Sequence, residues 1–334
     1  MALTVGILGA GYMGRTHSQI LQRDKQVSIT AVADPVAVAA KTLAEQCGAK
    51  ALSGLDELLD SGVQAVFITS PNATHVEASI KALGAGCSVF CEKPMAVTLQ
   101  SAQEVVAAAK KAKGVFQVGH NRRFAPVYTR LKELIASGEF KPLSAHIKMN
   151  RGELKKPSWV WDPKVTGGFL YESTLHLFDM ARWLLGDVER LIALSNQNVY
   201  PTADDFSIVM EFKNGVTCAF TSSAHTTWIY PFESIELYAE HQALVTEEME
   251  RVRYSPGLER GVVEHNFFQL AIPEKWGYAE EDRLFINAAL GEGEPPVTAL
   301  DGYKSVEIAD AVYRSKGRWM SLGDTKRRSR RKAK

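Results

Sequence analysis

Apolar residues in the first third of the chain form short continuous runs, separated by segments whose apolar positions follow helical spacing. A continuous apolar run between two helices is typical of a strand that is buried on both faces of a parallel sheet. The pattern therefore predicts a doubly wound α/β domain. Its predicted strands are Leu3–Leu8, Ser28–Asp34, Ala65–Ser70, Ser88–Cys91 and Val115–Gly119.

The pattern changes after about residue 121, where longer runs with the character of antiparallel strands follow one another. Two of these runs are joined by Lys213-Asn214-Gly215, and Asn-Gly between apolar runs is a strong hairpin signal. This half is predicted to be an α+β domain, an open and mainly antiparallel sheet with helices on one face. Its predicted strands are Leu143–Arg151, Arg190–Gln197, Phe206–Phe212, Val216–Ala224 and Phe232–Ala239, and its predicted helices are Val127–Ser137, Leu170–Leu185, Glu280–Leu290 and Gly302–Arg314.

The length and charge of the chain refine this division. A chain of 334 residues exceeds what one hydrophobic core usually organises, so we expect two domains, residues 1–121 and 122–323. Residues 324–334 hold seven basic residues and one acidic residue, which leaves 32 basic and 37 acidic residues before them. The mildly acidic body argues against nucleic-acid binding. We interpret the basic end as a solvated, disordered tail, with a nuclear-address or nucleic-acid role as the less favoured alternative.

The cysteine and hydropathy patterns exclude further classes. The four cysteines show no CxxC spacing, so neither a disulfide framework nor a metal site is expected. No apolar run approaches the roughly 20 residues that cross a bilayer. The first apolar stretch is too short for a signal peptide. We therefore expect a cytoplasmic protein with no membrane partner.

A glycine motif follows the first predicted strand. Gly9-Ala10-Gly11-Tyr12-Met13-Gly14 has the GxGxxG spacing and opens a predicted helix, the context of a dinucleotide-binding Rossmann fold. The first glycine permits the tight turn, the second lets a pyrophosphate approach the backbone, and the third allows close helix–strand packing. The diphosphate would lie at the positive end of the helix.

Asp34 ends the second predicted strand, 20 residues after Gly14. An acidic side chain at this place accepts hydrogen bonds from the adenosine ribose hydroxyls. It also repels a 2′-phosphate, and neither Pro35 nor Val36 supplies a compensating positive charge. The sequence thus favours NAD(H) over NADP(H). The alternative is that Asp34 only caps the following helix.

Four further motifs occur in order along the chain, and together with GxGxxG they resemble the glucose–fructose oxidoreductase / inositol dehydrogenase family (Gfo/Idh/MocA). They are Thr69–His75 (TSPNATH), Cys91–Pro94 (CEKP), Gly119–Phe124 (GHNRRF) and Gly167–Asp179 (GGFLYESTLHLFD). The resemblance implies a nicotinamide-dependent oxidoreductase that acts on a sugar, sugar acid or cyclic polyol. It also implies that the lysine of the EKP motif, Lys93, lies near the nicotinamide and the reacting carbon. The family's general acid/base histidine corresponds to His176.

The chemistry of alcohol oxidation is consistent with these two residues. A base must take the hydroxyl proton while hydride leaves the same carbon, and His176 is suited to that task. Lys93 can stabilise the developing alkoxide. The chain departs from the family at Glu172, where the family has Asp, and at Thr174. Glu172 could orient the imidazole or bind a substrate hydroxyl; the alternative is a surface ion pair with His176, four residues later.

Several other residues have two alternative roles. The resemblance places the TSPNATH turn and the EKP motif beside the cofactor, although Asn72 could simply be a helix N-cap. Arg122 and Arg123 could form ion pairs between the domains or bind substrate. Trp159, Trp161, Trp228 and Tyr230 could stack on a sugar or belong to the core. The expected cofactor-binding residues are Gly9, Gly11, Tyr12, Met13, Gly14, Asp34, Ser70, Pro71, Asn72, His75, Glu92 and Lys93; the expected substrate-binding residues are Arg122, Arg123, Trp161, Glu172 and His176.

The sequence thus predicts an NAD(H)-dependent sugar or polyol dehydrogenase with Lys93, His176 and Glu172 as its catalytic residues. Two alternatives remain: a glycosidase that oxidises its substrate transiently with bound NAD, and a regulator that binds dinucleotide without turnover. The open sheet face of the second domain would expose apolar surface unless it were covered, so we expect a homodimer or homotetramer.

Overall fold

The computed structural model describes residues 2–152, 160, 162–228 and 232–323. Contacts divide the chain into two compact units, residues 1–126, 156–175 and 269–306 in the first, and residues 127–155, 176–268 and 307–334 in the second. Domain boundaries at residues 121 and 323 remain predictions, because contacts do not show which segments fold independently. Within the described residues, no helix is long and apolar enough to cross a membrane.

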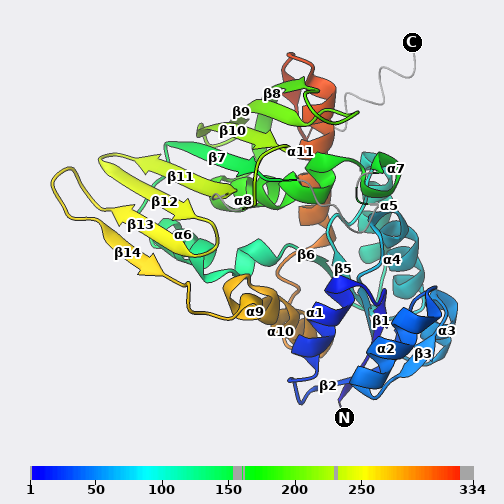
Figure 1. Cartoon of the computed structure of the whole chain (residues 1–334). Helices are drawn as coiled ribbons and strands as arrows, with labels where there is room; N and C mark the ends of the chain where they lie inside the picture. Colours follow the sequence, from blue (N-terminus) through cyan, green and yellow to red (C-terminus); the bar gives the residue numbers. More distant parts are fainter. Residues whose placement is uncertain (1, 153–159, 161, 229–231, 324–334) are drawn as a thin grey trace. The chain divides into compact units, whose positions relative to one another are not determined.

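A parallel sheet of six strands, in the order β3-β2-β1-β4-β5-β6, organises the first unit (Figure 1). This confirms the predicted doubly wound sheet. Ligands of such sheets bind at the carboxyl ends of the strands, where the strand order reverses, here between β1 and β4. The three-residue β3 was not predicted, because it is too short to show a pattern. The bounds are β1 Leu3–Leu8, β2 Val27–Ala33, β3 Lys50–Leu52, β4 Ala65–Ile68, β5 Ser88–Glu92 and β6 Phe116–Gly119.

One helix of this unit comes from the far end of the sequence. α10 packs against α1, and its Phe285 ring lies 5.2 Å from the Phe67 ring and 5.6 Å from the Phe90 ring. The sequence predicted this helix in the second domain, because a hydrophobic pattern does not show which sheet a helix covers. The helices are α1 Tyr12–Leu21, α2 Ala37–Cys47, α3 Leu55–Asp60, α4 His75–Gly84, α5 Leu99–Ala109, α7 Pro163–Thr166, α9 Ile272–Lys275 and α10 Tyr278–Ala289, with short η1 Asn72–Thr74 and η2 Asn121–Phe124.

A sheet of nine strands, in the order β14-β13-β12-β11-β7-β10-β9-β8-β15, organises the second unit. Its strands pair antiparallel except for β7 and β10. The predicted hairpin is confirmed, with Gly215 at φ 88° between β9 and β10. Strands β12 to β15 were not predicted. The bounds are β7 Ser144–Asn150, β8 Val188–Asn196, β9 Asp205–Phe212, β10 Thr217–Ser223, β11 Glu233–Ala239, β12 Gln242–Glu247, β13 Arg251–Ser255, β14 Val263–Asn266 and β15 Met320–Ser321.

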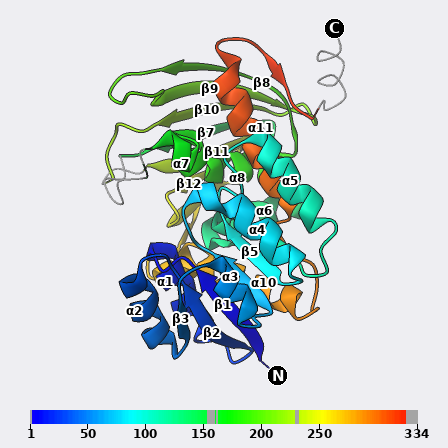
Figure 2. The same cartoon turned by 90° about the vertical axis from the view of Figure 1, so that its right-hand side faces the viewer.

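Helices cover one face of the second sheet, as predicted (Figures 1 and 2). The Phe178 ring of α8 lies 5.0 Å from the Phe220 ring of β10, and Tyr128 of α6 donates to Glu233 of β11. Side chains on the other face are exposed, among them Val209. The helices are α6 Pro126–Ala136, α8 Leu175–Leu185 and α11 Ala299–Ser315, of which α11 contributes to both units.

Candidate functional site

The glycine motif forms the turn between β1 and α1. Gly9 has φ +103°, which favours glycine. A Cβ atom on Gly14 would lie 2.0 Å from the Gly9 carbonyl oxygen, so only glycine fits there. A Cβ atom on Gly11 would meet nothing within 4 Å, and the first turn of α1 carries no acidic side chain. This open, electropositive turn fits a diphosphate.

Asp34 lies directly after β2 and is joined to the glycine turn. Its Oδ2 accepts from the Ala10 N–H at 2.8 Å, and its Oδ1 accepts from the Val36 N–H at 2.8 Å. The N-cap of α2 is Val36 and has no side-chain hydrogen bond, so Asp34 is not the cap of that helix. The carboxylate is half-buried, which leaves it accessible to a ligand at the turn.

The turn after β4 contains two polar side chains with specific partners. Asn72 Nδ2 donates to Glu172 Oε2 at 2.9 Å, and no side-chain cap is formed at η1 or α4. The N-cap interpretation of Asn72 is therefore wrong. His75 is buried between the Pro94 and Ser70 carbonyl oxygens, each 2.8 Å from a ring nitrogen. Burial lowers the pKa of His75, which favours the neutral ring.

Lys93 follows β5 and contacts Glu172 in two ways. Its Nζ donates to the Glu172 backbone oxygen at 2.7 Å and lies 3.8 Å from Oε1. Both side chains are about 15% exposed. The structure thus brings together two of the predicted catalytic residues and places Asn72 beside them.

The segment that carries Glu172 departs from the predicted continuous α-helix. Leu170–Thr174 forms a π turn (η4), and α8 begins only at Leu175. π turns inside helices occur frequently at functional sites. A spacing of four residues along an α-helix therefore does not describe Glu172 and His176. The hydrophobic pattern of the sequence gave no sign of the wider turn.

His176 is the second residue of α8 and belongs to the second unit. It is buried, with 7% of its surface exposed, and Asp179 is fully buried. The alternative of a surface ion pair between His176 and Glu172 is therefore wrong. Glu172 is an acidic partner of Lys93.

The remaining predicted residues lie in different surroundings. Arg123 forms an ion pair with Asp301, Nη2 to Oδ1 3.3 Å, inside the first unit and not between the units. The Arg122 guanidinium lies 5.5 Å from the Trp276 ring centroid. Tyr12 is 68% exposed beside the glycine turn. Trp161, Trp159 and Tyr230 lie outside the described residues.

A buried ion cluster next to Lys93 was not predicted. It consists of His17 of α1, Glu92 of β5 and Asp282 of α10. Although burial opposes it, Asp282 and Glu92 raise the pKa of His17 to about 10. His17 in turn holds the pKa of Glu92 below its usual value despite burial. The one signal in the sequence was a histidine three residues after Gly14, on the helix side that packs inward.

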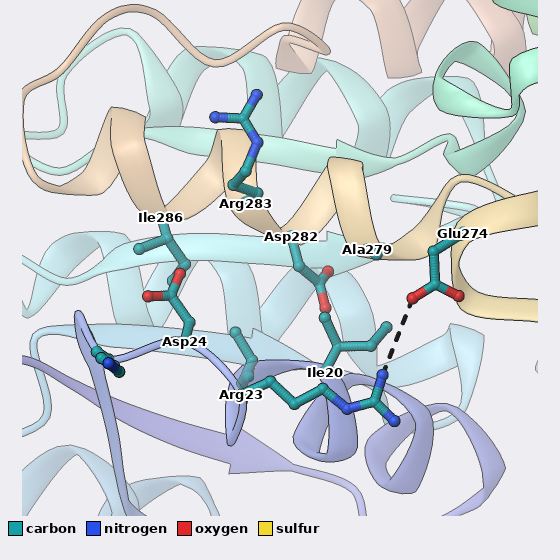
Figure 3. Close-up of a pocket in the computed structure, with 10 residues that line it drawn as sticks. Ile20, Arg23, Asp24, Glu274, Ala279, Asp282, Arg283 and Ile286 are labelled. Atoms are coloured by element: carbon teal, nitrogen blue, oxygen red, sulfur yellow. Dashed lines mark ion pairs between the residues drawn. The ribbon is translucent and has the colours of Figure 1, made fainter. Parts of the chain in front are cut away.

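A cavity of ≈ 480 Å³ lies between α1 and α10 (Figure 3). Charged side chains from α9, from α10 and from the segment after α1 line it, and Arg23 pairs with Glu274 at 3.9 Å across it. Asp282 forms part of its wall. Within the described residues, no group of three or more His, Cys, Asp or Glu side chains is arranged so that it could hold a metal ion.

Comparisons with known proteins identify the relatives of this chain. Residues 3–120 match a family model described as the oxidoreductase family, NAD-binding Rossmann fold (GFO_IDH_MocA), and residues 128–245 match the C-terminal domain model of the same family. An inositol 2-dehydrogenase of Rhizobium meliloti is 27% identical over 94% of this chain and 97% of its own. A myo-inositol 2-dehydrogenase of Thermotoga maritima is 27% identical over 94% and 96%.

Solved structures confirm the fold. A levoglucosan dehydrogenase in complex with NADH superimposes with a TM-score of 0.88 at 20% identity, over 96% of this chain and 99% of its own. A putative myo-inositol dehydrogenase from Sinorhizobium meliloti has a TM-score of 0.82 at 25% identity, over 96% and 100%. The predicted cofactor, NAD, agrees with the family model of the first unit.

Proposed function

Since the chain belongs to the Gfo/Idh/MocA family of NAD-dependent oxidoreductases, we propose that it oxidises a secondary alcohol of a sugar, sugar acid or cyclic polyol, or reduces the corresponding ketone. The observation that supports this most is the half-buried Lys93 ammonium held beside the Glu172 carboxylate. An ammonium at the carboxyl end of a parallel strand is suited to stabilise an alkoxide.

The residues of the first unit provide for binding of the cofactor. The N–H groups of the open turn at Gly11 would bind the diphosphate, with Tyr12 and Met13 in the first turn of α1 beside it. Asp34 would exchange its hydrogen bond from Ala10 for the ribose hydroxyls. Ser70, Pro71 and His75, in the turn after β4, would border the remainder of the dinucleotide. When bound, the nicotinamide accepts or donates the hydride.

Lys93 and Glu172 would bind the substrate around the reacting hydroxyl. An ammonium has three donors, and Lys93 directs one of them to the Glu172 backbone oxygen. The carboxylate of Glu172 is fixed by Asn72 and can accept from a neighbouring substrate hydroxyl. A polyol with adjacent hydroxyl groups supplies both partners. Arg122 is the proposed further substrate contact.

His176 would act as the general base. An imidazole can take the hydroxyl proton and return it in the reverse direction. It follows Glu172 by four residues in a continuous helical segment.

The test is a panel of inositols, sugars and sugar acids incubated with NAD, with NADH formation followed by absorbance. The relatives named inositol 2-dehydrogenase make inositols the first compounds to try. We expect the wild-type protein to oxidise at least one compound of the panel, and this activity to be lost when Lys93 is replaced. Binding of NADH without turnover of any compound would favour the regulator instead.

The proposal includes a homo-oligomer. Leu194, Val209 and Tyr238 lie on β8, β9 and β11 with exposed fractions of 63, 44 and 38%. Apolar residues on the uncovered face of a sheet are commonly buried by a second copy. Light scattering should give the mass of a dimer or tetramer, and Val209→Glu should lower that mass; a wild-type monomer would contradict this.

An NAD-dependent enzyme draws on the nicotinamide pool of the cell interior, so a cytoplasmic location is part of the proposal.

A further inference from the structure

The buried ion cluster contains no residue that is proposed above to act on the substrate, yet it ends at the backbone of Lys93. Glu92 Oε1 lies 3.1 Å from His17 Nε2, and Glu92 Oε2 accepts from the Lys93 N–H at 3.0 Å. One carboxylate thus connects the imidazole with the lysine. We propose that His17 is a positioning residue, which fixes Lys93 through Glu92; this inference rests on the proposed role of Lys93 in the reaction.

Hydrogen-bond geometry argues for a charged imidazole in this cluster. His17 Nδ1 lies 2.8 and 2.9 Å from the two oxygens of Asp282, while Nε2 faces Glu92. Ionised carboxylates only accept, and a neutral imidazole has one donor. With both carboxylates ionised, only an imidazolium can donate to both. Donation from a cation to Glu92 makes a strong bond and leaves Oε2 aimed at the Lys93 N–H.

The surroundings of His17 shield its side chain from solvent. The side chain of His17 is fully buried, and that of Asp282 is 1% exposed. The Phe67, Phe90 and Tyr278 rings lie 5.5, 4.9 and 5.9 Å from the imidazole. Hydrogen bonds in such a medium are strong, and a partner left alone is costly. Glu92 is therefore held in one orientation.

Stability alone does not account for three ionisable side chains at this place. Buried ionic groups can often be exchanged for apolar residues of similar volume without loss of stability. The cluster instead joins three distant parts of the chain, α1, β5 and α10, at the residue before Lys93. Figure 3 shows Asp282 on α10 facing α1.

Lys93 is consequently held at both ends. Glu92 binds its backbone N–H, and the Glu172 backbone oxygen binds its ammonium. Misplacement of a reacting group by about 1 Å can lower a rate by about 100-fold. Loss of the backbone bond should therefore lower kcat while NADH binding at the glycine turn persists.

A matched pair of variants tests this inference. In His17→Gln the amide nitrogen can replace Nε2 and still donate to Glu92, whereas in His17→Asn the shorter amide can replace only Nδ1 and reaches Asp282. Both variants remove the positive charge and one carboxylate contact. We expect His17→Asn to lower kcat about tenfold or more and His17→Gln about threefold or less, with Kd for NADH within about twofold of wild type in both. Leu58→Ala, a fully buried position on α3, provides a control for destabilisation alone.

A second readout does not depend on activity. The sequence contains two Glu–Lys dipeptides, Glu92-Lys93 and Glu274-Lys275. Protein with ¹³C-carbonyl glutamate and ¹⁵N-lysine therefore shows two selected amide resonances by NMR. The Lys93 resonance should move in His17→Asn and stay near its wild-type position in His17→Gln. The Lys275 amide donates to the Ala271 oxygen and should not move in either variant.

The outcomes separate this inference from the proposed function. Two results together would overturn it. The first is that both variants lose kcat equally, and only as much as Leu58→Ala does for the same decrease in Tm. The second is that the Lys93 amide resonance does not move in either variant. If the wild-type protein oxidises no panel compound, the proposed function fails, and the Lys93 resonance alone decides whether His17 positions the lysine. Should both variants fail to fold, Asp282→Asn takes their place: it weakens donation to Glu92 and should move the Lys93 resonance.

Discussion

Glu92 in the first unit and Asp204 in the second are both buried carboxylates, yet different partners stabilise them. Asp204 accepts from the backbone N–H groups of Asn198, Val199 and Tyr200, at 2.6 to 3.0 Å for the shortest bond of each. All three belong to the adjoining loop. Glu92 accepts instead from His17, distant in sequence, and from the Lys93 backbone.

The difference indicates what each carboxylate does. Although burial opposes it, the backbone donors hold the pKa of Asp204 below its usual value, and the bonds close a local turn. The bonds of Glu92 join α1, through His17, to a residue of the proposed site. Loss of Asp204 should affect stability alone, whereas loss of Glu92 should affect stability and catalysis together.

Removal of the Lys93 ammonium should have the largest effect. Lys93→Ala should lower kcat/KM about 100-fold or more, because alkoxide stabilisation is lost, and His176→Ala should do the same through loss of the base. Lys132→Ala is the matched control, since Lys132 lies over the Trp183 ring in the second unit. Steady-state kinetics with the best panel substrate measure this. Near wild-type rates in both site variants would remove these residues from the site.

The comparison itself is tested by Glu92→Ala and Asp204→Ala. Each variant leaves buried donors without their acceptor, which should cost about 1–3 kcal/mol or more and lower Tm in both. Only Glu92→Ala should also lower kcat, about tenfold or more, because Lys93 loses its backbone anchor. Equal activity in the two variants at temperatures where both are folded would show that Glu92 is structural too.

Asp34 extends the comparison of buried carboxylates. Like Asp204 it accepts hydrogen bonds from backbone N–H groups, but it is only half-buried and is therefore accessible to a ligand. NAD(H) should bind at least about tenfold more tightly than NADP(H), a difference of about 1.4 kcal/mol, because the carboxylate repels a 2′-phosphate. Asp34→Asn should reduce the preference to a few-fold. Calorimetric titration with both cofactors measures this, and equal affinities for the wild type would contradict it.

The last prediction concerns stability alone and is a pH dependence. With its pKa raised to about 10, His17 contributes stability that is complete below about pH 6.5 and is lost as the pH rises towards 10. The depressed pKa of Asp204 has the opposite sign, so its contribution is lost only as the pH falls through that value in acid. Between about pH 6.5 and 10, Tm should fall more in the wild type than in His17→Gln. If Tm changed with pH equally in the wild type and in His17→Gln, His17 would not titrate as described.

Local patterns in the sequence predicted most of this molecule. Continuous apolar runs predicted the bounds of β1 and β4 to within two residues. The GxGxxG motif predicted that only glycine fits at Gly9 and Gly14. The pairing of His17 with Asp282 could not be predicted, because the two residues are far apart in sequence and neither belongs to a motif. The π turn at Glu172 likewise depends on hydrogen bonds that no hydrophobic pattern records.

The central claim is that hydride passes between a polyol carbon and NAD at a site built on Lys93. Its most direct test uses myo-inositol, and then other panel members, with deuterium on every ring carbon, and mass spectrometry of the NADH formed. The account predicts one deuterium in NADH with the wild-type protein and at least about 100-fold less with Lys93→Ala. Absence of labelled NADH with every compound, or equal labelling by Lys93→Ala, would contradict it.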